Sequence, residues 1–185
     1  MPVLISMLRG VNVTGYNKIK MDALRALYES LKFESPRTFI TSGNVIFRTR
    51  QKNSPALAKK IQNAIETAFG FRPEVILRTT DELRSAIAAS PFPSHRNLHP
   101  SKILVTFLTD EPGPEVQARL LGLKGFPEEL HLIGRELYIY FPEGAGRSKL
   151  PWSKVEKLTQ TTGTARNWNS VTKMLAIAEE MEAAE

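Results

Sequence analysis

Residues 38–47 read TFITSGNVIF, a polar turn composition between two β-prone runs. The runs at 38–41 and 45–47 are rich in β-branched and aromatic residues, and they flank Ser42, Gly43 and Asn44, a combination typical of a tight turn. The stretch therefore predicts a β-hairpin.

Helical periodicity is found on both sides of this hairpin. Before it, residues 21–33 repeat leucine at helical spacing, and after it residues 55–69 place an apolar residue at every fourth position. Short β-prone runs at residues 3–8 and 74–78 precede the first helix and follow the second. The order β-α-β-β-α-β is that of a ferredoxin-like unit, in which two helices cover one face of a four-stranded antiparallel sheet.

The same order begins again in the second half of the chain. The expected elements are a strand, a helix, a hairpin and two helices, at residues 103–108, 114–123, 130–141, 152–158 and 164–181. We therefore predict an α+β protein with two ferredoxin-like units, antiparallel sheets and a C-terminal helix. The first unit is expected over residues 1–90, and the second over residues 100–185, as a βαββ unit with two C-terminal helices.

The segment between the two halves is predicted to contain a short helix and a linker. Thr79 and Glu82 have capping-box spacing, which predicts a short helix leading out of the first unit. Residues 90–101 contain three prolines and have linker composition. His95 and His99 lie in this linker without a nearby carboxylate, so no metal site is predicted.

Composition narrows the class of protein. The 185 residues include no cysteine, which excludes disulfides, thiolate metal ligands and cysteine nucleophiles. The first strand has no basic residue ahead of it and no cleavage pattern behind it, and no run approaches the ~18–20 apolar residues of a membrane span. We expect a cytoplasmic protein with no cofactor and no membrane partner, and its oligomeric state stays open.

Charge is unevenly distributed along the chain. Lys and Arg number 25 against 19 Asp and Glu, for a net charge of +6. Acids are absent from residues 1–21, 35–65 and 83–109 and collect at residues 179–185. This segregation favours an anionic small molecule, or nucleic acid bound weakly and without sequence preference, as the partner. A basic surface that serves only solubility is the alternative.

Two polar segments could hold such a partner. The loop RGVNVTGYNK, residues 9–18, follows a strand and precedes a helix, but it lacks the Gly-Lys-Ser/Thr end of a P-loop, so a connection with turn glycines is the alternative. In TARNWNSV, residues 164–171, a helix would place Arg166 and Asn169 on a polar face, opposite an apolar face with Trp168.

Four motifs together resemble a bacterial domain-of-unknown-function family, family 1697. In chain order they are LRGVNV, TSGNVIF, SKL and TARNWNSV, at residues 8–13, 41–47, 148–150 and 164–171. The chain departs from the family pattern at Thr14, where the family often has Gly, and at Ser170, where it often has Thr. The resemblance implies a two-part ferredoxin-like α+β fold, and it implies no reaction, cofactor or catalytic residue.

The motif residues form a set of cations, amides and a hydroxyl without any carboxylate. The predicted ligand-binding residues are Arg9, Asn12, Lys18, Ser42, Asn44, Lys149, Arg166, Asn167 and Asn169. General acid–base and divalent-metal chemistry need Asp, Glu or His, so this set is better suited to holding an anion. We predict binding of a phosphate-bearing ligand, small molecule or nucleic acid, in a basic, amide-rich cleft between the halves.

Two other functions stay open. One is an enzyme of unknown reaction that uses Arg and backbone amides to stabilise phosphoryl or acyl charge, with catalytic residues unknown. The other is an interaction scaffold whose motifs are structural turns. The sequence therefore leaves open whether the chain is an enzyme.

Overall fold

The computed structural model describes residues 1–92 and 97–184 and shows an α+β chain with two four-stranded antiparallel sheets. The chain divides into two compact units: unit 1 is Met1–Arg84 with Lys173–Glu185, and unit 2 is Ser85–Thr172. In this division the end of the C-terminal helix belongs to unit 1. The expected domains over residues 1–90 and 100–185 stay a prediction. None of the described helices is long and apolar enough to cross a membrane.

Unit 1 follows the element order predicted from its sequence. Its elements are β1 (Val3–Leu8), α1 (Met21–Ser30), β2 (Glu34–Phe39), β3 (Asn44–Arg48), α2 (Pro55–Phe69) and β4 (Val75–Thr79). The strand order is β2-β3-β1-β4, and every neighbouring pair is antiparallel. The hairpin over residues 38–47 is thus confirmed. Pro36 fits into β2 because this edge strand shifts register between Glu34 and Arg37.

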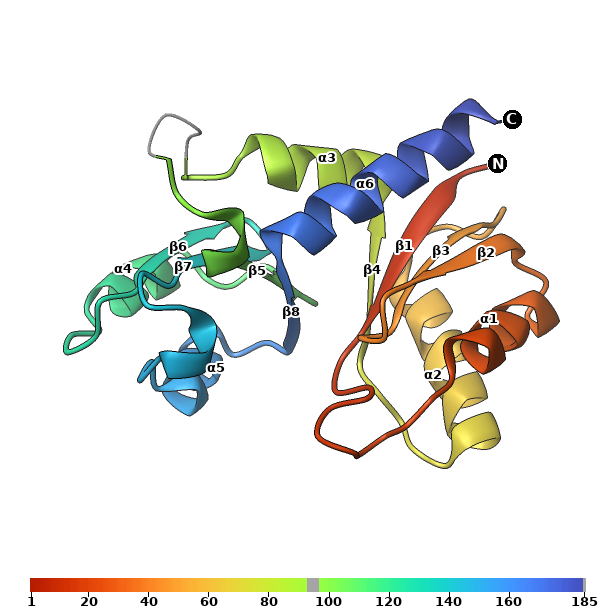
Figure 1. The fold of residues 1–185 in the computed structure, drawn as a ribbon, viewed down its shortest axis with the longest axis horizontal. Helices are drawn as coiled ribbons and strands as arrows, with labels where there is room; N and C mark the ends of the chain where they lie inside the picture. Colours follow the sequence, from red (N-terminus) through yellow and green to blue (C-terminus); the bar gives the residue numbers. More distant parts are fainter. Residues whose placement is uncertain (93–96, 185) are drawn as a thin grey trace. The chain divides into compact units, whose positions relative to one another are not determined.

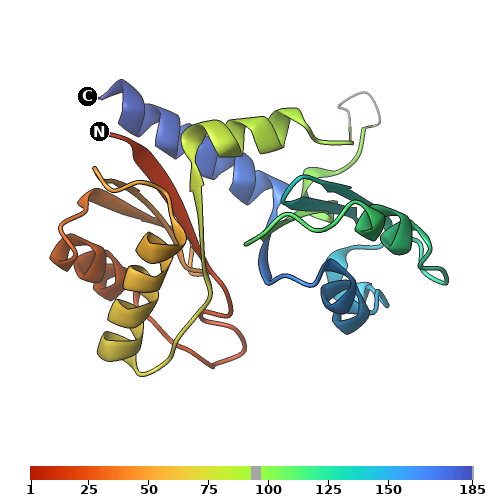
Figure 2. The ribbon, with the colours of Figure 1, turned by 180° about the vertical axis from the view of Figure 1, so that it is seen from behind.

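Both faces of this sheet are buried. Figures 1 and 2 show α1 and α2 on one face, where Leu4 of β1 packs in a core with Leu24 and Ile61 of the helices. On the opposite face Ile5 and Ile46 are also fully buried. Strands β1, β3 and β4 are thus buried on both faces, which favours the sheet ends, loops or the β2 edge for a binding site.

Unit 2 contains the same six elements in the same order. They are β5 (Ile103–Leu108), α4 (Glu115–Leu121), β6 (Glu129–Ile133), β7 (Glu136–Tyr140), α5 (Trp152–Thr159) and β8 (Gly163–Asn167), with strand order β6-β7-β5-β8. Residues of α4, α5 and the sheet form its core. Two further helices, α3 (Thr80–Ala88) and α6 (Trp168–Ala183), each contribute residues to both units.

Strand β8 corrects the predicted βαββ form of the second unit. The sequence pattern predicts residues 164–167 at the start of the last helix, but Thr164 and Arg166 are buried while Ala165 and Asn167 are exposed, which is the alternation of a strand. Arg166 pairs in register with Val105 of β5. A two-residue period over five residues is too short to stand out beside the longer helical pattern that follows it.

Candidate functional site

The predicted site residues of unit 1 lie in the connection between β1 and α1, residues 9–20, and in the β2–β3 turn beside it. The backbone N–H of Leu8 donates to the carbonyl of Gly43 at 2.9 Å, so β1 ends against this turn. The side-chain amide of Asn12 donates to the carbonyl of Thr41 at 2.8 Å. Loop and turn are therefore joined at one end of the sheet.

Asn12 organises the loop from within. Its Nδ2 also donates to the carbonyl of Ile19 at 3.0 Å, and its Oδ1 accepts from the backbone N–H of Ile19 at 2.9 Å. The backbone N–H of Asn12 donates to the carbonyl of Asn17 at 3.1 Å, and Asn17 Nδ2 donates to the carbonyl of Gly10 at 3.0 Å. The Asn12 side-chain amide thus closes the loop through Ile19 and joins it to the hairpin turn through Thr41, which makes this residue a structural tie.

Left-handed backbone is concentrated in this loop and turn. Among non-glycine residues, φ is +55° at Asn12, +45° at Thr14, +50° at Asn17 and +50° at Ile40. Asparagine tolerates such angles, but β-branched Thr and Ile do so at a cost of about 1–3 kcal/mol each. Strain of this size persists only where the surrounding contacts hold it in place.

Ser42 of the turn and Asn44, the first residue of β3, also have structural contacts. Asn44 is fully buried, and its Nδ2 donates to the carbonyl of Phe39 and to Ser42 Oγ, both at 3.0 Å. Gly43 between them has φ +81°, and a Cβ there would lie 2.9 Å from the Cβ of Leu8. Glycine is therefore required at this position.

The two predicted cations of unit 1 lie at the same end of the sheet. Arg9, directly after β1, is half-buried, and Lys18, in the loop, is exposed. All five predicted residues of unit 1 thus lie in the loop or at the adjoining hairpin turn, and two of them, Asn12 and Asn44, hold the backbone.

Unit 2 holds the other four predicted residues. Lys149 is exposed in the connection between β7 and α5. Asn167 caps α6, because its Oδ1 accepts from the backbone N–H of Ser170 at 2.8 Å. Asn169 is exposed in the first turn of α6, and Arg166 lies on β8, so the helical face that was predicted to carry both is wrong. Trp168, the first residue of α6, is half-buried.

Arg166 is a buried cation. Its side chain is 6% exposed, and its Nη1 donates to Thr164 Oγ1 at 2.8 Å and to the carbonyl of Ala165 at 2.9 Å. Burial lowers the pKa of the Arg166 guanidinium to about 10. The group therefore stays charged at neutral pH.

An equivalent arginine occupies the same position in unit 1. Arg78 is the fourth residue of β4, as Arg166 is of β8, and it is 1% exposed. Arg78 pairs with Ile5, the third residue of β1, as Arg166 pairs with the third residue of β5. Its Nη1 donates to the carbonyl of the preceding residue, Leu77, at 3.0 Å. A buried arginine at this point is thus a feature of both units.

Unit 1 also contains a basic pocket that no motif of the sequence indicates. Its volume is about 160 Å³, and its walls are Met1, Lys32, Glu34, Arg48, Thr49, Arg50 and Gln51. It lies at the opposite end of β1 from the loop, because Val3 pairs with Arg48 whereas Leu8 contacts Gly43. Three cations face one carboxylate in this pocket.

Arg48 is one of the residues that line the pocket. Its Nη2 donates to the carbonyl of Met181 in the part of α6 that belongs to unit 1. Its Nε is buried and has no hydrogen-bond partner among the residues that the structure describes. A buried donor without an acceptor costs about 1–3 kcal/mol, so this atom is suited to meeting an acceptor on a ligand.

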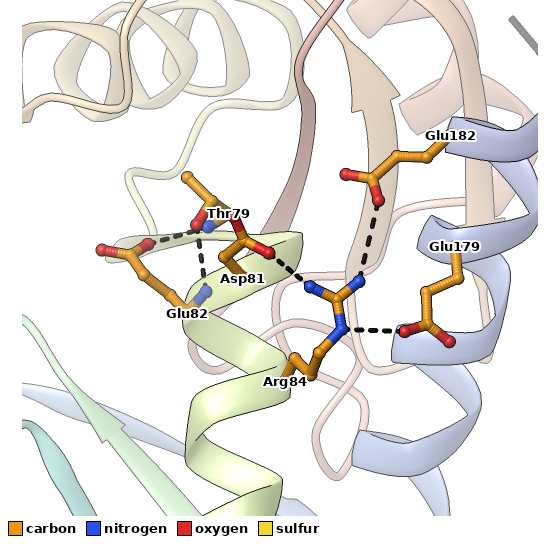
Figure 3. A network of polar contacts seen from close by, with 6 residues as sticks. All are labelled: Thr79, Asp81, Glu82, Arg84, Glu179 and Glu182. Carbon is orange, nitrogen blue, oxygen red and sulfur yellow. Dashed lines mark hydrogen bonds and ion pairs between the residues drawn. The ribbon is translucent and has the colours of Figure 1, made fainter.

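Acidic residues of α6 contact arginines of unit 1. Figure 3 shows the Arg84 guanidinium between Asp81 and the carboxylates of Glu179, at 3.0 Å, and Glu182, at 3.8 Å. Glu180 pairs with Arg37 at 2.8 Å. These acids are far from the basic stretches in sequence but beside them in the folded unit, so the charge segregation of the sequence is partly cancelled.

The capping box predicted at the start of α3 is confirmed. The backbone N–H of Thr79 donates to Glu82 Oε2 at 2.8 Å, and the backbone N–H of Glu82 donates to Thr79 Oγ1 at 3.1 Å (Figure 3). Of the two linker histidines, His95 lies outside the described residues, and His99 contacts Ser101 Oγ at 2.6 Å. Within residues 1–92 and 97–184, no group of three or more acidic or histidine side chains is arranged to hold a metal ion.

Comparisons with known proteins agree with this architecture. The chain is similar in structure to a conserved bacterial protein from Streptococcus pneumoniae, SP0830, with a TM-score of 0.73 and 21% sequence identity, over 97% of this chain and 99% of that chain. At this identity the likeness shows the fold alone. No curated protein matches the sequence. A family model described as "Protein of unknown function (DUF1697)" matches residues 1–138, and the chain therefore belongs to the DUF1697 family.

Proposed function

We propose that this chain binds a phosphate-bearing small molecule through the basic pocket of Lys32, Arg48 and Arg50 in unit 1. The observation that carries the proposal is the buried Nε of Arg48, a donor without an acceptor among the described residues. An arginine fork and two further cations are the groups that proteins use to hold phosphate oxygens.

The size of the pocket limits the ligand. At about 160 Å³ it is well below the ~300–1,000 Å³ of pockets that enclose a whole drug-sized ligand. It is suited to one phosphate or pyrophosphate group, and the rest of the ligand would lie outside. Glu34 in the wall disfavours a second anionic group at that side.

The composition of the pocket favours binding over catalysis. Its walls contain one carboxylate and no histidine, so they supply no pair of groups for general acid–base chemistry. An enzyme in which arginine stabilises transferred charge is therefore less well supported than a binding protein. That the nine residues predicted from sequence form one ligand site stays a prediction.

The fold type is part of the proposal. We assign both units to the ferredoxin-like type, supported by their shared β-α-β-β-α-β order and by strand orders β2-β3-β1-β4 and β6-β7-β5-β8. Such units serve many unrelated functions, so the proposed activity depends on the pocket and not on the fold.

The experiment is a thermal-shift and calorimetric titration with inorganic phosphate, pyrophosphate and a panel of nucleotides and sugar phosphates. We expect at least one of them to raise the Tm of the parent protein. Arg50→Gln and Lys32→Gln should each weaken that ligand about tenfold or more, because each removes a charge-assisted hydrogen bond. Lys59→Gln is the matched control, since Lys59 is an exposed cation of α2 outside the pocket.

Two results would contradict the proposal. One is equal affinity of the Arg50, Lys32 and Lys59 variants, which would place any bound anion elsewhere. The other is a panel in which no compound stabilises the parent at millimolar concentration.

A further inference from the structure

The β1–α1 loop of unit 1 is more elaborate than its fold requires. It runs over residues 9–20, whereas the equivalent β5–α4 connection of unit 2 is residues 109–114 and contains no positive φ. The unit 1 loop includes positive φ at Asn12, Thr14 and Asn17 and is closed by side-chain hydrogen bonds of both asparagines. Unit 2 forms the same sheet without these features, so they point to a role other than folding.

The tip of this loop presents apolar side chains to solvent. Val13 and Tyr16 form an isolated β-bridge and are 53% and 76% exposed, and Ile40 of the adjoining turn is 47% exposed. The N–H of Tyr16 donates to the carbonyl of Val13 at 2.9 Å, which closes the tip. An aromatic side chain is thus displayed on a hydrogen-bonded support.

The charged residues of the loop that carries Tyr16 are all cations. Lys18 and Lys20 follow it in the same connection, both exposed, and Arg9 begins the connection. Residues 1–21 contain no acid. Charge complementarity therefore selects an anionic partner, and an exposed aromatic ring selects one that offers unstacked bases.

We propose that the loop of residues 9–20 binds single-stranded nucleic acid, with Tyr16 stacking on a base and Lys18 and Lys20 contacting the phosphates. A duplex offers no free base face to a single ring at a loop tip, so single strands are preferred. With so few cations the binding is weak and salt-dependent. This site is separate from the phosphate pocket, because the six residues of β1 hold the two about 20 Å apart.

The test is fluorescence anisotropy with a fluorescein-labelled 20-nucleotide oligodeoxythymidine at low and physiological salt. Tyr16→Ala should weaken binding about tenfold or more, because the stacking contribution of one base is lost. Tyr16→Phe should bind within about twofold of the parent, since the ring is kept. Lys18→Gln should lower the salt dependence by about one counterion.

Two control variants test whether binding depends on this loop alone. Leu121→Ala removes another exposed apolar side chain, in unit 2, and should leave the affinity unchanged. Lys59→Gln removes an exposed cation outside both the loop and the phosphate pocket and should also leave oligonucleotide binding unchanged. All of these variants should keep the parent Tm, because the substituted side chains are exposed.

Three results would overturn the inference. Tyr16→Ala could bind the oligonucleotide as the parent does, or Tyr16→Phe could lose as much affinity as the alanine variant. In the third, the protein binds vesicles of phosphatidylserine and phosphatidylcholine, this binding depends on Tyr16, and the protein does not bind the oligonucleotide. The loop would then be a membrane contact.

Discussion

Units 1 and 2 have the same six elements and the same strand order, but they differ in how the first strand is connected to the first helix. In unit 1 this connection is residues 9–20, three of which are non-glycine residues at positive φ, whereas in unit 2 it is residues 109–114, none of which has positive φ. In the β2–β3 turn of unit 1, Ile40 has φ +50°. The equivalent turn of unit 2, between β6 and β7, consists of residues 134–135 alone. What the units share is what the fold requires, and what only one of them has is available for function.

The shared features include a buried arginine and a side-chain cap after the last strand. Arg78 and Arg166 occupy the same position in β4 and β8, and Nη1 of each donates to the carbonyl of the preceding residue. The next helix is capped by Thr79 in one case and by Asn167 in the other. Arg166 was predicted as a ligand-binding residue, but its counterpart in unit 1 favours a structural role.

The largest expected effect comes from the two buried arginines. Arg78→Ala and Arg166→Ala should each lower the free energy of unfolding by about 2–5 kcal/mol, because each leaves a cavity in a buried position. Arg78→Met and Arg166→Met should cost less, about 1.5 kcal/mol or under, since methionine fills the space and needs no hydrogen bonds. Urea denaturation followed by circular dichroism measures these changes. If Arg166→Met is as unstable as Arg166→Ala, the charge of Arg166 is needed for stability. If Arg78→Met is tolerated at the same time, the two arginines are not equivalent.

A smaller effect is expected from the asparagines that hold the two different connections. Asn12→Ala should lower the free energy of unfolding by about 2–3 kcal/mol, because three hydrogen bonds of its side chain are lost and alanine disfavours φ +55°. Asn167→Ala removes one helix cap and should cost about 1 kcal/mol. The same denaturation experiment compares them. If both variants lose the same free energy of unfolding, Asn12 stabilises the loop of unit 1 no more than Asn167 stabilises the start of a helix.

Release of backbone strain should have a still smaller effect, of opposite sign. Thr14→Gly and Ile40→Gly should each raise the free energy of unfolding by about 0.5 kcal/mol, because the relief of left-handed strain exceeds the entropy that glycine loses on folding. Glu111→Gly in the unstrained connection of unit 2 is the control and should be neutral or destabilising. A loss of stability in both strained variants would remove strain as a distinguishing feature of unit 1.

The smallest effect concerns pH, through a tail contact that only unit 1 has. A hydrogen bond from Arg37 lowers the pKa of the Glu180 carboxyl below its ordinary value of 4.5. Because the folded pKa is below the unfolded one, this contact stabilises the fold above pH 4.5 and is lost as the pH falls through the folded pKa. Glu180→Gln should therefore reduce the loss of Tm between pH 5 and about pH 3. Glu143→Gln, at an exposed site of unit 2, is the control, and an equal reduction there would exclude a specific role for Glu180.

The sequence predicted local features better than assembled ones. The hairpin at residues 38–47 and the capping box of Thr79 and Glu82 depend on neighbours within a few positions, and both are confirmed. Strand β8 was missed because its identity depends on pairing with β5, far away in the chain. Tertiary pairing of this kind overrides local propensity.

The candidate sites were harder to predict for the same reason. The pocket joins Lys32 to Arg48 only because Glu34 pairs with Arg48 across β2 and β3, and no spacing in the sequence indicates this. Conversely, Asn12, Asn44 and Asn167 look like ligand-binding amides in the sequence, but each satisfies backbone groups left open by a turn or a helix end. An amide beside a turn therefore carries little information about ligands until its backbone partners are known.

The division of the chain has a consequence for its synthesis. Unit 2 is one continuous segment, Ser85–Thr172, but unit 1 is completed by residues that follow it, from Lys173 onward. Met174, Ala178 and Met181 in that last segment are fully buried. As the chain leaves the ribosome, unit 2 can therefore finish folding before unit 1, whose first 84 residues wait with an uncovered apolar surface until the end of α6 is made. The residues of unit 1 that precede unit 2 in the chain are thus completed only by residues that follow unit 2.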